Sequence, residues 1–185
     1  MIIRKYKESD KERLRYICRQ TAGADFQKSD KRLNAAVIIY NDYFTENEAD
    51  NIFVLADESD TPVGYILCST DYEKYKRLNL DIYIKKATKC TLFGTVCVLG
   101  SLYAQHIIKD RPAHLHIDIL PDYQHQGWGR KLIDTLCQHL KAQNISYLSV
   151  NTISRKSPAY PFYISCGFAE YKAIGPGNFA LSKRL

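Results

Sequence analysis

The sequence has 185 residues, of which 45% are hydrophobic and 12% aromatic, and a formal net charge of +6. A chain of this length can bury one substantial core but is short for two, so we expect a single domain over residues 1–185. Its lysines and arginines are dispersed and accompany no recognition motif, which disfavours a nucleic-acid-binding protein. A small phosphate-bearing ligand is equally consistent with this surplus of positive charge.

The six cysteines include no Cys-x-x-Cys pair, so the sequence indicates neither a zinc site nor a disulfide framework, and we expect no metal. The first 20 residues contain no apolar signal region. The longest apolar-leaning stretch, Thr91 to Ala104, contains glycines and falls short of a membrane span. These features predict a cytoplasmic protein with reduced cysteines and no membrane partner.

The first part of the chain predicts a strand, two helices and a β-hairpin. These elements cover residues 2–6, 9–22, 33–44 and 51–69. Ser9 and Glu12, three residues apart, have the pattern of a capping box at the start of the first helix. Residues 71–112 combine a start rich in tyrosine, lysine and arginine with an amphipathic stretch, and we interpret them as a peripheral helical insert.

The second part of the chain begins with a predicted strand over 113–120 whose two faces differ. Under the alternation of a strand, His114, His116 and Asp118 share one face, opposite a face of aliphatic residues. The remaining predicted elements are a helix from 127, a strand over 145–150, a short helix over 158–166 and closing strands over 168–174 and 179–185. This order predicts a mixed α/β sheet with helices on both faces.

Between the strand 113–120 and the next helix lies the loop Gln-His-Gln-Gly-Trp-Gly, residues 124–129. Glycines at the first turn of a helix favour anion binding, because a phosphate can approach the unpaired amides at the positive end of the helix dipole. The loop lacks the third glycine of a dinucleotide fingerprint and the Gly-Lys-Ser/Thr of a P-loop. We therefore expect a pyrophosphate site and disfavour a Rossmann enzyme or an NTPase.

Two motifs in this region resemble those of one enzyme family. The pattern Gln-x-x-Gly-x-Gly over 124–129 is similar to the acetyl-CoA motif of the GNAT superfamily of N-acetyltransferases, and Phe-Tyr-x-x-x-Gly-Phe over 162–168 is similar to its C-terminal motif. Both occur in the family's order, and the resemblance covers nearly the whole chain. Residues 113–121 are also loosely similar to bacterial proteins related to the acetyltransferase-like domain of O-GlcNAcases. The resemblance implies the GNAT fold, in which a splayed strand pair, here 113–120 and 145–150, holds acyl-CoA.

The resemblance implies acetyl-CoA as the cofactor. The residues expected to bind it come from the end of the strand, from the loop and from the next strand: Ile119, Leu120, Gln124, His125, Gln126, Gly127, Trp128, Gly129, Arg130 and Asn151. Two positions depart from the family's pattern, since Gln124 stands where arginine is frequent and Lys156 where asparagine is common. Asn151 has a second interpretation, as the cap of a turn.

Four residues are candidates for the chemistry of acyl transfer. In the family the tyrosine of the C-terminal motif, here Tyr163, often protonates the departing CoA thiolate. An amine nucleophile must lose a proton, which favours His116 or Asp118 as the base, with His114 behind them. The alternative is structural: a hydrogen-bonded cluster for the polar residues and a core ring for Tyr163.

The predicted activity is direct transfer of an acetyl or longer acyl group from acyl-CoA to a primary amine, within a ternary complex. The acceptor is a small molecule or a peptide, and we expect its pocket to come from residues 26–44 and 71–112. The alternative function is a non-catalytic acyl-CoA-binding module. A homodimer is left open by the sequence.

Overall fold

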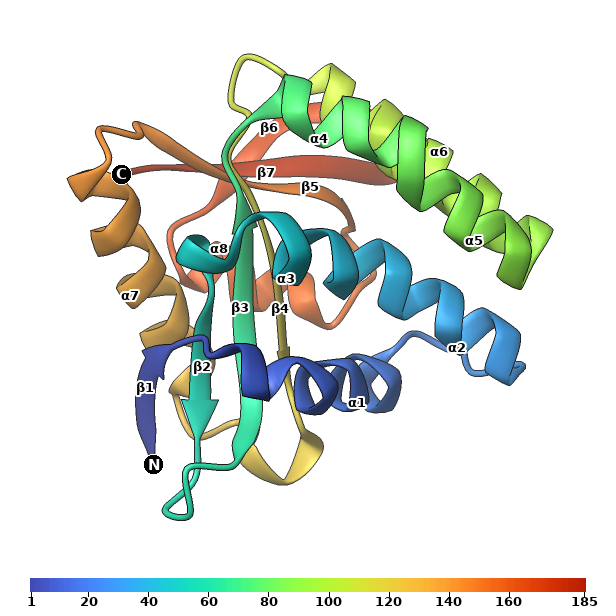
Figure 1. Ribbon diagram of the computed structural model, residues 1–185. Coiled ribbons are helices and arrows are strands. Elements are labelled where there is room, and N and C mark those ends of the chain that lie inside the picture. The colour runs from blue at the N-terminus through green and yellow to red at the C-terminus, as the bar shows by residue number, and fades with distance from the viewer.

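The computed structural model describes residues 1–185, which form one seven-stranded sheet of order β1-β2-β3-β4-β5-β7-β6 (Figure 1). The strands are β1 Ile2–Lys5, β2 Phe53–Ala56, β3 Pro62–Ser69, β4 His114–Ile119, β5 Tyr147–Ser154, β6 Ala169–Gly175 and β7 Asn178–Arg184. Neighbouring strands are antiparallel except β4 and β5, which run parallel. The mixed sheet expected from the order of elements is confirmed.

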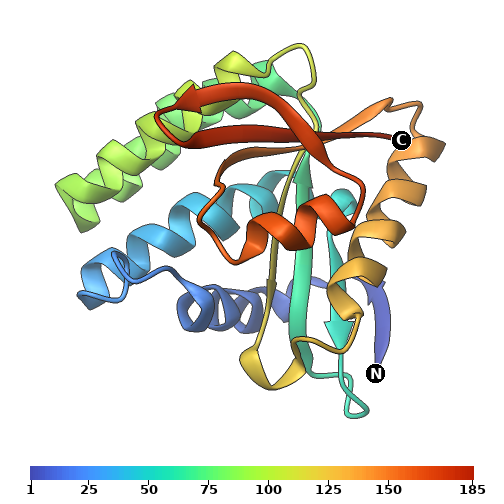
Figure 2. The same ribbon diagram turned by 180° about the vertical axis from the view of Figure 1, so that it is seen from behind.

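Helices cover both faces of this sheet. They are α1 Lys11–Thr21, α2 Asp30–Val37, α3 Tyr43–Asn47, α4 Tyr72–Leu78, α5 Ile84–Cys90, α6 Leu92–Ile107, α7 Trp128–Ala142 and α8 Ala159–Ser165. Single π-helical segments, Ile38–Asp42 and Asn79–Tyr83, join α2 to α3 and α4 to α5. In Figure 1, α1, α2 and α3 lie in front of the sheet, and Figure 2 shows α8 on the opposite face, next to α7.

The sheet separates two hydrophobic cores. A cluster of 20 buried residues, which includes Leu115 and Ile119, lies between the sheet and helices α7 and α8. A second cluster of 19 lies between the other face and the remaining helices. Because side chains alternate along a strand, the aliphatic residues of β4 enter the first core. His114, His116 and Asp118 point to the other face, as the sequence predicted.

The stretch 71–112 is helical, as predicted, but it is not peripheral. Tyr75, Tyr83, Ala87 and Val98 are buried, and all belong to the second core. Helices α5 and α6 pack against each other, as Figure 1 shows, and α6 also contacts β5 and β6. Most lysines and arginines of this stretch are exposed, which favoured the peripheral interpretation.

The cap of the first helix differs from the predicted one. Ser9 is exposed, whereas Asp10, 5% exposed, ends the 3₁₀ turn Glu8–Asp10 that leads into α1. The Asp10 carboxylate accepts the backbone N–H of Lys7 at 2.9 Å and two bonds from the Arg4 guanidinium at 2.7 and 3.0 Å. The carboxylate thus closes the turn that precedes α1 by binding a backbone donor and a guanidinium together, and α1 itself starts without a side-chain cap.

All six cysteines are free thiols, four of them buried. None of the helices combines the length and the hydropathy needed to cross a bilayer.

Asp10→Ala is expected to lower the free energy of unfolding by about 2–3 kcal/mol, because it removes a charged partner of Arg4 and the acceptor of the Lys7 amide. Ser9→Ala is the matched control and should change it by less than about 0.5 kcal/mol. Urea denaturation of both variants measures the difference. An equal loss in the two would return the cap to Ser9.

Candidate active site

Strands β4 and β5 separate along their length. They pair only between His114 and Ser149, where the Ser149 N–H donates to the Ala113 carbonyl at 2.8 Å. Beyond that point β5 continues to Ser154, further than predicted, and pairs with β7 on its other side. Its register shifts between Val150 and Ile153, which bends it away from β4. The splayed pair implied by the family resemblance is confirmed.

The splay leaves the amides on one edge of β4 without a strand partner. The Leu120 N–H donates to the Val63 carbonyl of β3 at 2.9 Å, so it points away from β5. Since N–H groups alternate in direction along a strand, those of Ile119 and Ile117 point into the gap. Leu120 was expected to offer its amide to the cofactor, and this hydrogen bond prevents that. Ile117, two residues before Ile119 in the same alternation, presents a second amide to the gap and was not among the residues expected from the sequence.

The loop before α7 presents a row of free amides. No backbone N–H of residues 125–130 donates to another backbone group, and the first bond of the helix runs from Lys131 N to Gly127 O at 3.2 Å. Gly127 has φ +81° and His125 φ +59°, both in the left-handed region. Turns of this kind direct successive N–H groups toward one point, which favours an anion such as a phosphate.

Side chains of the loop hold its shape. Gln124 Nε2 donates to the Ile119 carbonyl at 2.7 Å, and Gln126 Nε2 donates to the Asp122 carbonyl at 3.1 Å. Arg130 donates to the Ser165 carbonyl at the end of α8 at 2.8 Å. A glutamine at position 124 can therefore brace the loop through its amide.

A cavity of about 540 Å³, here called the loop cavity, lies between this loop and α8. Of the expected cofactor residues, it is lined by Ile119, Gln124, His125, Gly127, Gly129 and Arg130. Leu120, Gln126, Trp128 and Asn151 do not line it. Its wall on the α8 side comes close to the loop, since a Cβ on Gly129 would stand 3.0 Å from the Phe162 ring. A side chain at 129 would therefore press on the Phe162 ring and displace it.

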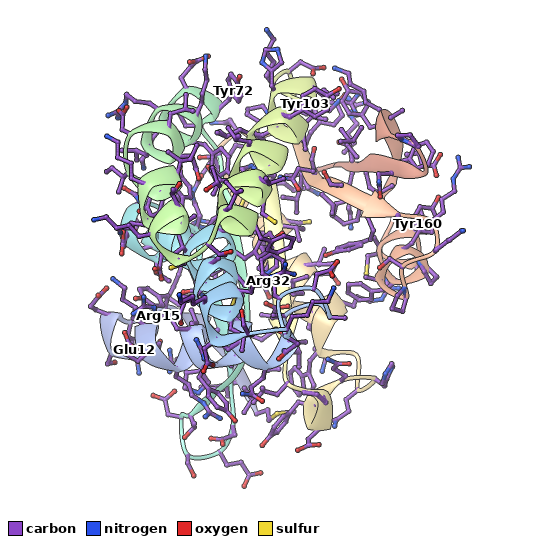
Figure 3. The ribbon with its side chains drawn as sticks, turned by 90° about the vertical axis from the view of Figure 1, so that its right-hand side faces the viewer. Glu12, Arg15, Arg32, Tyr72, Tyr103 and Tyr160 are labelled. Atoms are coloured by element: carbon purple, nitrogen blue, oxygen red, sulfur yellow. The ribbon has the colours of Figure 1, made fainter.

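A second cavity, of about 650 Å³, lies on the other side of the splay and is here called the aromatic cavity. Its walls come from α1, the π-helical segment Ile38–Asp42, α6, β4 and β5, and include His116, Asp118 and Asn151. Figure 3 shows this side of the molecule, where α6 with Tyr103 lies opposite α8 with Tyr160. Ala159 and Tyr163 line both cavities, so the two meet at the start of α8.

His116 and Asp118 form a hydrogen-bonded pair within the aromatic cavity. His116 Nε2 lies 3.0 Å from Asp118 Oδ2, which also accepts the Tyr65 hydroxyl at 2.5 Å. Burial, followed by the charge of Asp118, raises the pKa of Tyr65 well above its ordinary value, so this hydroxyl remains a donor. The imidazole also stacks on Tyr40, with ring centroids 5.0 Å apart and planes 16° apart. The pair is therefore held from both sides.

His114 is separated from the other two polar residues of β4. It is buried, and its Nδ1 lies 3.1 Å from the Pro112 carbonyl. Its Nε2 has no hydrogen-bond partner and no exposed surface. Burial lowers the pKa of His114 to about 4. The imidazole is thus neutral at physiological pH, and although the residue lines the aromatic cavity its Nε2 is buried.

Tyr163 is presented by the short helix α8. The Ser157 hydroxyl accepts the Ala159 N–H at 3.2 Å at its start, and Gly167, with φ +86°, ends it. The Tyr163 side chain is 8% exposed, and burial raises the pKa of its hydroxyl above the ordinary value. A phenol in this position stays protonated through the neutral and mildly alkaline range, so its proton is present when a cofactor would bind.

The cations at the start of α8 lie outside both cavities. Arg155 is exposed and makes two hydrogen bonds of 2.6 Å to Glu170, which also accepts the Tyr160 hydroxyl. Arg155 is therefore engaged on the surface, and neither it nor Lys156 lines the space that a cofactor would fill.

Residues 13–168 match the family model described as the acetyltransferase (GNAT) family, and the chain belongs to this family of acetyltransferases. Among curated proteins the sequence has no match. Solved structures share its fold. SsHAT superposes with a TM-score of 0.80 at 23% identity, over 99% of this chain and 97% of its own. The PaiA N-acetyltransferase from Thermoplasma acidophilum, in complex with coenzyme A, superposes with a TM-score of 0.64 at 16% identity, over 100% of this chain and 98% of its own. A putative phosphinothricin N-acetyltransferase superposes with a TM-score of 0.60 at 16% identity, over 100% of this chain and 98% of its own.

Gly127→Val is expected to abolish the thermal stabilisation by CoA, because its side chain stands where a phosphate would approach the free amides. In the unmodified protein, ligand at a hundred times its Kd should add about 2.7 kcal/mol. Gly177→Val is the control, since Gly177 also has a positive φ, +72°, and open space around it but lies in the β6–β7 turn. Both variants bear a backbone strain of about 1–2 kcal/mol. Only Gly177→Val should keep the CoA-dependent shift in Tm, and a normal shift in Gly127→Val would locate the cofactor elsewhere.

Proposed function

We propose that the protein transfers the acetyl group of acetyl-CoA directly to a primary amine, at the junction of the loop cavity and the aromatic cavity. The observation that carries this proposal is that Tyr163 and Ala159 line both cavities. A thioester at this junction would lie within reach of an amine on the opposite side of the splay. Holding two reactants in this way can supply on the order of 7–11 kcal/mol toward the barrier at the upper limit, so no covalent enzyme intermediate is required.

The cofactor would bind through backbone groups. The free amides of residues 125–130 are suited to the pyrophosphate, with the Arg130 guanidinium at the edge of the loop cavity. The amides of Ile117 and Ile119, which point into the gap, are suited to the pantetheine chain, whose amide groups pair as a strand would. The neighbour from Thermoplasma acidophilum, which carries coenzyme A, supports this cofactor.

On the acceptor side, we assign the base to His116 and its orientation to Asp118. The hydrogen bond from Nε2–H to Asp118 leaves Nδ1 with the free lone pair, a tautomer that follows from the hydrogen-bond network. Nδ1 would take the proton that the ammonium must lose, directly or through water. The Asp118 carboxylate would then stabilise the imidazolium.

Tyr163 would act in the second half of the reaction. The neutral amine nitrogen bonds to the carbonyl carbon of the thioester, the carbon–sulfur bond breaks, and the thiolate of CoA leaves. The nitrogen, positively charged after the attack, releases its second proton to water, and water reprotonates the tyrosinate after the transfer. The Tyr163 hydroxyl makes no hydrogen bond to the protein, so it is free to donate its proton to that sulfur.

A cytoplasmic location is part of the proposal, because the six free thiols are typical of a reducing compartment.

Tyr163→Phe removes only the hydroxyl, so CoA affinity should be kept while kcat falls by ~10²–10⁴ if this group is the general acid. Tyr160→Phe, on the same helix, is the control and should keep full turnover, because its hydroxyl bonds Glu170 on the surface. CoA release in the steady state and calorimetry for CoA binding supply the two measurements. Full activity in Tyr163→Phe would make the tyrosine structural.

His116→Ala should lower kcat/KM by ~10²–10⁴ and remove the acidic limb of its pH profile, since that limb reports the free base. Asp118→Asn should also lower kcat/KM, because it removes the carboxylate that orients the ring and stabilises the imidazolium. His106→Ala, on α6 and bonded to Tyr72, is the control and should leave the profile unchanged. An unaltered limb in His116→Ala would assign the proton acceptor to water.

A further inference from the structure

The aromatic cavity has an unusual composition for a site that receives a charged substrate. Fifteen of its 25 lining residues are hydrophobic. Six aromatic rings line it: Phe26, Tyr40, Phe44, Tyr75, Tyr103 and Tyr163. Asp118 is the one residue of the lining with a formal charge, and neither lysine nor arginine takes part. A ligand in this cavity therefore meets rings on most sides and a carboxylate at one point.

The charge of the lining restricts the charge of the acceptor. One ammonium group is stabilised by the Asp118 carboxylate and by the electron-rich faces of the rings. A carboxylate or phosphate on the acceptor would be taken out of water beside Asp118 without a cation to pair with it, which is strongly unfavourable. A second ammonium group would find no second carboxylate. The composition thus selects a single positive charge.

The arrangement of the rings restricts the shape of the acceptor. Phe26 packs edge-on against Tyr40 at 5.6 Å and against Phe93 at 5.2 Å, so neighbouring rings fix its position. A planar or branched body can pack against such rings through edge and face contacts. An unbranched lysine arm of a protein would leave much of the 650 Å³ unfilled and forgo those contacts. Of the six rings only Tyr103, 58% exposed, lies at the surface.

We propose that the acceptor is a small primary monoamine with an aromatic or branched hydrocarbon body and no anionic group. This inference rests on the proposed function, and it identifies the class of substrate rather than the reaction. The amine would lie beside Asp118 and His116, and the body would fill the ring-lined part of the aromatic cavity.

Acetyl-CoA turnover with 2-phenylethylamine, phenylalanine and a lysine-containing peptide tests the proposal, because phenylalanine adds only a carboxylate to the first compound. We expect kcat/KM for 2-phenylethylamine to exceed that for phenylalanine by ~10²-fold or more, the effect of an unpaired buried charge. Equal or faster turnover of phenylalanine or of the peptide would overturn the substrate class and leave the acetyltransferase activity intact.

Calorimetric titration of the CoA-bound protein separates this proposal from the proposed function. Saturable binding of 2-phenylethylamine together with much weaker binding of phenylalanine would support the substrate class, whether or not any amine releases CoA. Failure of every amine to release CoA would instead contradict the proposed acetyltransferase reaction. Equal affinity for the two compounds, or no binding of 2-phenylethylamine, would overturn the substrate class.

A positive charge placed in the aromatic cavity should reduce the preference for 2-phenylethylamine over phenylalanine. Cys97 lines the aromatic cavity and is half-buried, so Cys97→Lys supplies the missing cation. It should lower the preference for 2-phenylethylamine over phenylalanine by about tenfold, as a new charge pair would. Cys90→Lys is the matched control, because Cys90 is equally half-buried but outside the cavity, and it should keep the preference. An unchanged preference in Cys97→Lys would place the amine elsewhere.

Discussion

Strands β4 and β5 run parallel but are hydrogen-bonded at only one end, and the site depends on the bonds that they do not make. In a continuous sheet the amides of Ile117 and Ile119 would pair with β5. The register shift between Val150 and Ile153, and the bonds that tie β5 to β7, keep the two strands apart. Backbone donors left unpaired in a cleft need a partner, and a ligand with its own amide groups can provide it. The same opening also joins the cavities on the two sides of the sheet.

The acceptor side of β4 is organised by contacts from distant parts of the chain. Tyr65 of β3 donates to Asp118, and Tyr40 stacks on His116. Both tyrosines pack in the second core, so the orientation of the His116–Asp118 pair depends on the packing of that core. Groups held in this manner need little rearrangement when charge develops, which is how a fixed polar environment lowers a barrier. Helix α6 completes the wall of the cavity, which explains why the helical insert is part of the core.

The parts of the site that the sequence predicted are those with local chemistry. The glycines at 127 and 129 define a turn into a helix, and the alternation of β4 places its polar residues on one face. The contacts of Tyr65 with Asp118 were not predictable, because 53 residues separate them and neither lies in a motif. The cap at Ser9 was wrong for a similar reason, since the competing bond between Asp10 and Arg4 depends on the position of β1. The family resemblance predicted the fold well but had no information on the rings that shape the acceptor cavity.

Strand β4 presents its backbone on one side and its polar side chains on another. Its free backbone edge faces the gap between β4 and β5, whereas the side chains of His116 and Asp118 line the aromatic cavity, where we propose that the acceptor binds. Side-chain substitutions on that face leave the amides of the edge unchanged. Over evolution, acceptor preference in a lineage with this strand can therefore diverge quickly while recognition of the acyl donor is inherited intact. Paralogues with the same glycine loop and the same His116 and Asp118 but other rings in the aromatic cavity would be the products of such divergence.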